Sequence, residues 1–165
     1  MRTLTKTVLI FAAALLGIST VNAQKIDKKA ARIAAYQKMI DTPDFKITLE
    51  KAFPKDANMV TLTGSPSISI SGGTLTCEAP YYAGARVDGN SRVDFSTTNF
   101  IYQSQKGASG QKYNMMITPK PGSTDMKDVT QIVITIVTEE MVSVQISFNG
   151  KEALGYEGYI EKYKP

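Results

Sequence analysis

The strongest constraint on the fold is a two-residue period in hydrophobicity that begins after Pro43. In residues 45–50 (FKITLE), positions 45, 47 and 49 are apolar and the positions between them are polar. Successive side chains of a β-strand point to opposite faces, so this alternation is typical of a strand with one buried face. Further strands are expected over residues 59–63, 67–71, 74–78, 91–97, 101–105, 113–118, 129–138, 141–148 and 154–160.

Turn-forming residues separate most of these segments. Clusters of glycine, proline, asparagine and aspartate occur at 64–66, 72–73, 88–90, 107–110, 119–122 and 149–150. The Asn149-Gly150 pair predicts a type I′ hairpin, the tightest connection between two antiparallel strands. No segment of crossover-helix length lies between the strands, which excludes parallel βαβ units and predicts antiparallel pairing.

Two of the strand segments predict how the sheet is covered. Residues 142–148 are apolar on one face only, so this strand is expected to be half exposed. Residues 132–137 are apolar on both faces, which predicts a central strand with cover on both sides. The N-terminal helix, a second sheet or the far wall of a barrel could each provide that cover.

One helix is expected before the first strand, over residues 27–41 (DKKAARIAAYQKMID). Its apolar residues recur at helical spacing, Asp27 is a candidate N-cap, and Thr42-Pro43 ends the element. The expected fold class is therefore mainly β: an antiparallel β-sandwich or incomplete β-barrel with one N-terminal α-helix.

The first 23 residues have the pattern of a secretory signal peptide. Arg2 and Lys6 precede a short apolar run at 8–18, and small residues follow at 21–23. A membrane-spanning helix needs about 20 apolar residues, and this run is too short. We expect cleavage near Ala23-Gln24, a secreted or periplasmic protein without a transmembrane segment, and one β-rich domain over residues 24–165. No cysteine follows the apolar run that could carry a lipid.

Composition excludes several classes of function. The sequence has no histidine and a single cysteine, Cys77, so His-based catalysis, His or Cys metal clusters and an internal disulfide are excluded. The formal net charge is +4, and the basic residues are scattered rather than clustered on one face. Nucleic acid is therefore not an expected partner, and no cofactor or metal is expected.

Several motifs together resemble one known family. These are residues 45–54 (FKITLEKAFP), the Gly72-Gly73 strand leading into 79–84 (APYYAG), the strand at 113–117, and 156–160 (YEGYI). In this order they resemble the domain of unknown function 4251 family of secreted proteins from Bacteroides-like bacteria. The middle motif of that family reads Leu-Pro-Tyr-x-Gly, and Ala79 stands where its Leu is usual. The resemblance implies a fold and a compartment, but no activity.

The segment around residues 80–86 is the candidate binding site. It combines two adjacent tyrosines in a proline-containing loop with a guanidinium that could pair with an anion. In one interpretation, one of these tyrosines fills the core and the other covers a strand end. In the other, they form an aromatic-lined sheet face or barrel mouth with tyrosines of later strands. The candidate ligand-binding residues are Tyr81, Tyr82, Arg86, Tyr102 and Tyr113.

Two functions remain open at this stage. The preferred one is a non-catalytic binding module for a small apolar or amphiphilic ligand or a glycan. The alternative is a structural or protein-interaction component of the cell envelope, without a ligand pocket. A glycoside hydrolase would need two carboxylates at a defined separation, and Glu78, Asp88 and Asp94 lie near the candidate loop. Asp88 is better explained by an Asp-Gly turn, so no catalytic residue is assigned.

Overall fold

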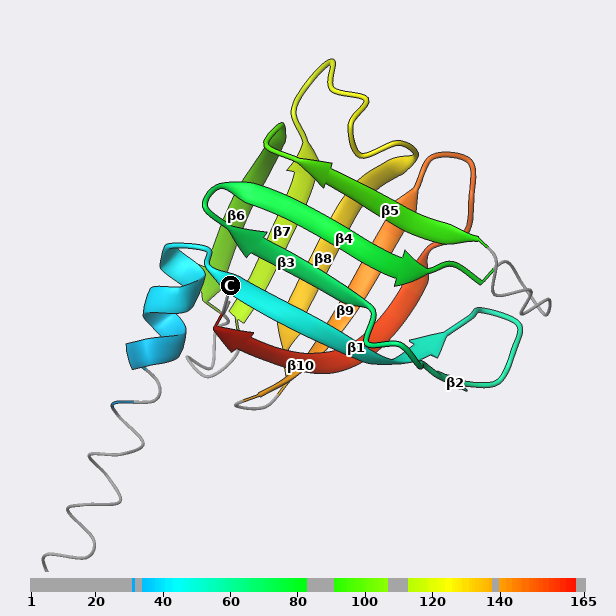
Figure 1. Ribbon diagram of the computed structural model, residues 1–165, viewed down its shortest axis with the longest axis horizontal. Helices are drawn as coiled ribbons and strands as arrows, with labels where there is room; N and C mark the ends of the chain where they lie inside the picture. The colour runs from blue at the N-terminus through cyan, green and yellow to red at the C-terminus, as the bar shows by residue number, and fades with distance from the viewer. Residues whose placement is uncertain (1–30, 32–33, 83–90, 107–112, 138–139, 163–165) are drawn as a thin grey trace, which may run out of the picture. The chain divides into compact units, whose positions relative to one another are not determined.

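The computed structural model describes residues 31, 34–82, 91–106, 113–137 and 140–162 (Figure 1). The chain divides into two units, residues 1–38 and 39–165. In the first unit, the described residues 31 and 34–38 are helical. The helix ends at Asp41, shortly before Pro43, as its sequence predicts. The expected signal peptide, Asp27 and the start of the expected helix lie outside the described residues.

The second unit contains one antiparallel sheet, and every expected strand is present in it. Each strand lies within a few residues of its expected bounds. The strands are β1 (Phe45–Phe53), β2 (Val60–Thr61), β3 (Ser67–Ser71), β4 (Thr74–Pro80), β5 (Arg92–Thr97), β6 (Phe100–Lys106), β7 (Tyr113–Pro119), β8 (Val129–Ile136), β9 (Met141–Phe148) and β10 (Leu154–Lys162).

The sheet curves into a nearly closed barrel. The strand order is β5-β4-β3-β1-β10-β9-β8-β7-β6, and β2 pairs with β1. Pairing of β1 with β10 joins the first and last strands of the sequence. Figure 1 shows β1, β3, β4 and β5 crossing in front of β6–β9, while β10 curves from one layer to the other. The two ends of the strand order, β5 and β6, are not paired with each other. The fold is thus the incomplete barrel of the two expected architectures.

The interior of this sheet is filled by side chains. Alternate residues of most strands point inward, and many are completely buried, including Phe45, Ile70, Met115 and Tyr156. Thr97 is the one buried polar residue among the described positions. Because small barrels are closed by their own side chains, a ligand could bind only at an edge or an end of this core.

The lone cysteine is part of this core. Cys77 lies on β4 opposite Ile68 and Phe95, and none of its surface is exposed. Burial raises the pKa of the Cys77 thiol to about 12, so it stays protonated at physiological pH. This agrees with a small apolar residue and not with a reactive thiol.

Two local predictions are wrong. Val133 on β8 is half-buried and Val137 just after β8 is 42% exposed, so the outer face of β8 is only partly covered by the described residues; β8 lies between β9 and β7, third from the end of the strand order. The Asn149-Gly150 pair does not form a two-residue hairpin, because residues 149–153 all lie between β9 and β10. Of the pair, only Gly150 has a positive φ, and type I′ requires two.

The physical reason for the longer loop is that β9 pairs with β8 farther along the chain than it pairs with β10. Phe148 still pairs with Val129 of β8, whereas the pairing with β10 begins only at Ile146 and Leu154. The longer loop spans this difference. Two consecutive positive φ angles occur instead at Gly72 and Gly73, +56° and +78°, between β3 and β4.

Neither a membrane helix nor a cluster of metal ligands is found in the part of the chain that the structure describes. Its helix does not combine the length and the apolar character that crossing a bilayer requires. Within the same ranges, no group of three Asp, Glu, Cys or His side chains could hold a metal ion.

Candidate functional site

The predicted tyrosines do not form one surface. Phe45 pairs with Ile70, and Ile70 pairs with Leu75 near the start of β4. Tyr81 lies six residues beyond Leu75, about 20 Å away at the rise of a β-strand. The ring of Tyr102 lies 6.5 Å from that of Phe45, so it is near the other end of β4. Sequence reasoning missed this separation because it depends on strand pairing.

Tyr102 and Tyr113 have structural surroundings. The Tyr102 hydroxyl donates a hydrogen bond of 2.9 Å to the carbonyl oxygen of Ile40, at the end of the helix. Burial, and then the charge of Asp41, raise the pKa of Tyr102. Tyr113 is only 6% exposed, and the Lys106 ammonium lies 5.9 Å from its ring centre. Arg86 lies outside the described residues, and Tyr82 is half-buried directly after Tyr81.

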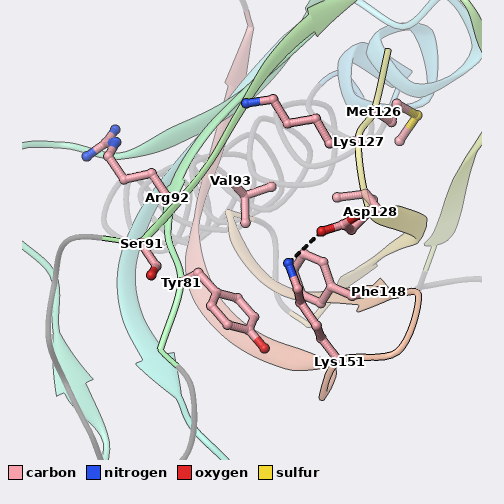
Figure 2. Close-up of a pocket in the computed structure, with 10 residues that line it drawn as sticks. Tyr81, Ser91, Arg92, Val93, Met126, Lys127, Asp128, Phe148 and Lys151 are labelled. Carbon is pink, nitrogen blue, oxygen red and sulfur yellow. Dashed lines mark hydrogen bonds and ion pairs between the residues drawn. The ribbon is translucent and has the colours of Figure 1, made fainter. Parts of the chain in front are cut away.

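Tyr81 lines a cleft that we call the Tyr81 cleft (Figure 2). It has a volume of about 370 Å³ and opens between the start of β5, the start of β8 and the loop after β9. Its lining residues are Tyr81, Ser91, Arg92, Val93, Met126, Lys127, Asp128, Val129, Phe148 and Lys151. Of the predicted site residues, only Tyr81 belongs to it.

The floor and one wall of the Tyr81 cleft are apolar. Val93, Met126 and Val129 are each at most 7% exposed, so they join the cleft to the packed core. Tyr81 stands against Phe148 with ring centres 5.0 Å apart and an interplanar angle of 79°. This edge-to-face geometry is favourable for aromatic pairs. The backbone N–H of Tyr81 donates to the Ser91 carbonyl at 2.8 Å, which fixes the position of the wall.

The rim of the cleft is charged. The Lys151 ammonium pairs with the Asp128 carboxylate, which raises the pKa of Lys151. The Arg92 Nε donates to Asp94 Oδ2 at 2.9 Å, and this contact raises the pKa of Arg92. Lys127 is exposed, and the structure gives it no ion pair with a described residue. Lys127, Asp128 and Lys151 lie outside the predicted strands, so periodicity gives no signal for them.

Asp125 anchors the loop that supplies part of this rim. Its Oδ2 accepts hydrogen bonds of 2.8 Å from both Thr97 Oγ1 and Asn99 Nδ2, next to the connection between β5 and β6. These two hydrogen bonds, that from Asn99 first, lower the pKa of the Asp125 carboxyl. The loop between β7 and β8 is thereby tied to the open edge of the barrel.

This anchor predicts a pH-dependent contribution to stability. A carboxyl whose pKa is lower in the folded state than in the unfolded state stabilises the fold above its unfolded pKa, about 3.9. That contribution is lost as the pH falls through the folded value. We expect the wild type to be more stable than Asp125→Asn above pH 5, and the difference to shrink below about pH 4. Urea unfolding of both proteins between pH 7 and pH 2.5 measures it. A pH-independent difference would contradict the assignment.

The carboxylates considered for hydrolysis lie elsewhere. Glu78 and Asp94 are directly opposite each other on β4 and β5, on the outer face of the sheet. Asp94 is held by Arg92, its side chain is 45% exposed, and its Oδ1 has no hydrogen-bond partner. Asp88 lies outside the described residues. The next cross-strand pair on this face is Thr76 and Ser96, whose hydroxyls are 3.1 Å apart.

Two motifs far apart in the sequence meet beside the Tyr81 cleft. The hydroxyl of the fully buried Tyr156 donates to the carbonyl oxygen of Pro80 at 2.6 Å. Two residues later, Gly158 lies against β1, where a Cβ atom would come within 2.1 Å of the Thr48 carbonyl oxygen. The Pro-Tyr segment at the end of β4 is therefore held directly by the Tyr-Glu-Gly segment of β10.

The comparison with protein families agrees with these motifs. The family model described as a domain of unknown function (DUF4251) matches residues 27–160. The chain belongs to the DUF4251 family. No curated protein matches it. In this DUF4251 chain, Tyr156 and Gly158 have roles in packing, whereas Tyr81 of the middle motif lines the cleft. The motifs that carry the family resemblance thus combine structural residues with one candidate site residue.

Proposed function

We propose that this DUF4251 protein is an exported, non-catalytic binding module that holds a small amphiphilic molecule in the Tyr81 cleft. The observation that carries the proposal is the apolar floor of Val93, Met126 and Val129 at the surface of an otherwise filled core. A solvent-accessible site that is joined to the core offers a ligand apolar contact that an exposed sheet face does not.

The dimensions and composition of the cleft support this choice of ligand. Its volume of about 370 Å³ is near the lower end of the range for small-molecule sites, roughly 300–1,000 Å³. The faces of Tyr81 and Phe148 are partly used in their own edge-to-face contact, which leaves less flat surface for stacking a sugar. The apolar floor with a polar rim therefore favours an amphiphile over a glycan.

The non-catalytic and exported parts of the proposal have separate support. Asp128 is the one carboxylate among the described residues that line the cleft, and it is paired with Lys151. A pair of converging carboxylates, as acid–base hydrolysis needs, is thus not formed by these lining residues. Export is proposed from the charged start, short apolar run and small residues of positions 1–23.

Binding of the neutral fluorescent amphiphile N-phenyl-1-naphthylamine tests the proposal. We expect saturable binding to the folded wild type, and affinity at least about tenfold lower for Tyr81→Ala, because truncation removes one wall of the site. Tyr159→Ala is the matched control, because Tyr159 is 46% exposed on β10 and does not line the cleft. No saturable binding to the folded protein, or equal affinity in both variants, would overturn the proposal.

One observation favours the alternative function as a protein-interaction component. β6 ends the strand order, five of its seven residues are exposed, and its only charged residue is Lys106. An edge strand with few charged residues can pair with a strand of another protein. A failure of the amphiphile to bind the folded protein would leave this edge as the better-supported functional surface.

A further inference from the structure

We infer that the Tyr81 cleft selects amphiphiles with an anionic head group, and that Lys127 is the residue that recognises the charge. This inference rests on the proposed function and adds the class of ligand to it. A single monomeric amphiphile is meant, with an apolar body on the cleft floor and a carboxylate, sulfonate or phosphate at the rim.

The first argument is the charge balance of the rim. Three cations, Arg92, Lys127 and Lys151, line the cleft, together with one carboxylate, Asp128. Lys151 is neutralised by Asp128, and Arg92 shares its charge with Asp94, just outside the cleft. The charge of Lys127 is not balanced by a described acidic side chain. A ligand anion there would gain an ion pair without breaking an existing one.

The second argument is the backbone of Lys127. Its φ is +54°, a left-handed conformation that costs free energy for a residue with a side chain and that favours glycine or asparagine. Lysine has no backbone reason to occupy such a position. Local strain that is retained in this way is typical of residues that must present a side chain at a site.

The third argument is that the position of Lys127 is fixed. Its N–H donates to the Thr124 carbonyl at 3.0 Å, and the Val129 N–H donates to the Met126 carbonyl at 3.0 Å, so two successive turns enclose it. The Asp128 carbonyl accepts from the Asn149 N–H at 2.8 Å, which ties the segment to the loop after β9. A backbone held in this way needs no ordering when a ligand binds, so only the Lys127 side chain loses conformational freedom.

Figure 2 shows where the head group would lie. Lys127 extends above Val93 toward the side of the cleft formed by Ser91 and Arg92, and away from the Lys151–Asp128 pair. Ser91 lies farther from Lys127 in this view, beside Tyr81. The head group would thus be at Lys127, with the apolar body between Val93 and Tyr81.

A pair of probes with the same aromatic body tests the inference. 8-Anilino-1-naphthalenesulfonate carries a sulfonate that N-phenyl-1-naphthylamine lacks. We expect the anionic probe to bind the wild type about 5–20-fold more tightly than the neutral one at low salt, with the difference falling as salt screens it. Lys127→Gln is expected to remove this preference, because it lowers the affinity for the anionic probe by about that factor and the affinity for the neutral probe much less. Octanoate is expected to displace the anionic probe from the wild type at lower concentration than octan-1-ol does.

The controls separate the two hypotheses. Lys120→Gln removes a cation from the same loop that does not line the cleft, and it should change neither affinity. If the neutral probe does not bind the folded wild type, the proposed function fails. If it binds and requires Tyr81, but the anionic probe binds no more tightly, the proposed function stands and the anionic selectivity is wrong. Equal losses for both probes in Lys127→Gln would also overturn the role of Lys127.

Discussion

Gly158→Ala is expected to destabilise the protein by more than about 3 kcal/mol, because the added methyl group has no space. Its Cβ would lie 2.1 Å from the carbonyl oxygen of Thr48, 2.9 Å from the carbonyl carbon and 3.0 Å from the Cα of Leu49. All three are backbone atoms of β1, so no side-chain rotation relieves the clash. β1 and β10 would have to move apart along the pairing that joins the first and last strands of the sequence. Urea unfolding followed by circular dichroism measures the loss.

A second glycine of the same strand is the matched control. At Gly155 a Cβ would lie 3.7 Å from the Phe53 Cβ, an ordinary van der Waals distance. Gly155→Ala is therefore expected to change stability by less than about 1 kcal/mol. If Gly158→Ala unfolds at the same urea concentration as Gly155→Ala, the close approach of the two backbones is not what requires glycine at position 158. If Gly158→Ala does not fold at all, the yields of soluble protein are compared instead, and Gly158→Ala is expected to give much less than Gly155→Ala.

The sequence predicts the strands of this fold better than their connections and partners. Alternation is a local property, so strands such as Ser67–Ser71 and Met141–Phe148 are recognisable from a few residues. Pairing between β1 and β10 is not local, and nothing in either segment specifies it. The register shift between Leu49 and Lys51 in that pair, and the need for Gly158 opposite it, follow only from the pairing.

The connections were harder because equivalent turn signals can have different outcomes. Gly72-Gly73 forms the tight turn with both φ angles positive, whereas Asn149-Gly150, with an equally strong local preference, lies in a longer loop. The difference is set by the continued pairing of Phe148 with Val129, a contact between distant residues. A local preference decides a turn only when the flanking strands end together.

The candidate site shows the same limit. Tyr81 was predicted because two tyrosines after Pro80 are unusual, but its partner Phe148 is 67 positions later in the chain. Lys127 gave no sequence signal, since a lysine in a loop is ordinary and only its left-handed φ distinguishes it. Conversely, residue type alone favours Tyr102 and Tyr113, and the structure places them in separate surroundings. The sequence can show which residue types would suit a binding site, but only the fold shows which side chains lie together in one site.

Tyr156→Ala is expected to have the other large effect, a loss of about 3–5 kcal/mol, because a large side chain with no exposed surface would leave a cavity. Tyr156→Phe keeps the ring and removes only the hydroxyl, so a loss of about 1 kcal/mol is expected from the 2.6 Å hydrogen bond to the Pro80 carbonyl. Pro80 is half-buried, so water can partly replace that bond. Burial also raises the pKa of Tyr156, so its hydroxyl stays a donor throughout the accessible pH range.

Tyr159, three residues along the same strand, separates burial from residue type. It is 46% exposed, so Tyr159→Ala is expected to cost less than about 1 kcal/mol, although the chemical change is identical. Equal losses at positions 156 and 159 would contradict the packing role of Tyr156.

The Tyr156→Phe variant also tests the link between the two family motifs. If the Tyr156–Pro80 hydrogen bond positions the segment that carries Tyr81, this variant should weaken binding of N-phenyl-1-naphthylamine while the barrel remains folded. Unchanged binding would show that the segment is positioned by the Tyr81–Ser91 backbone contact instead.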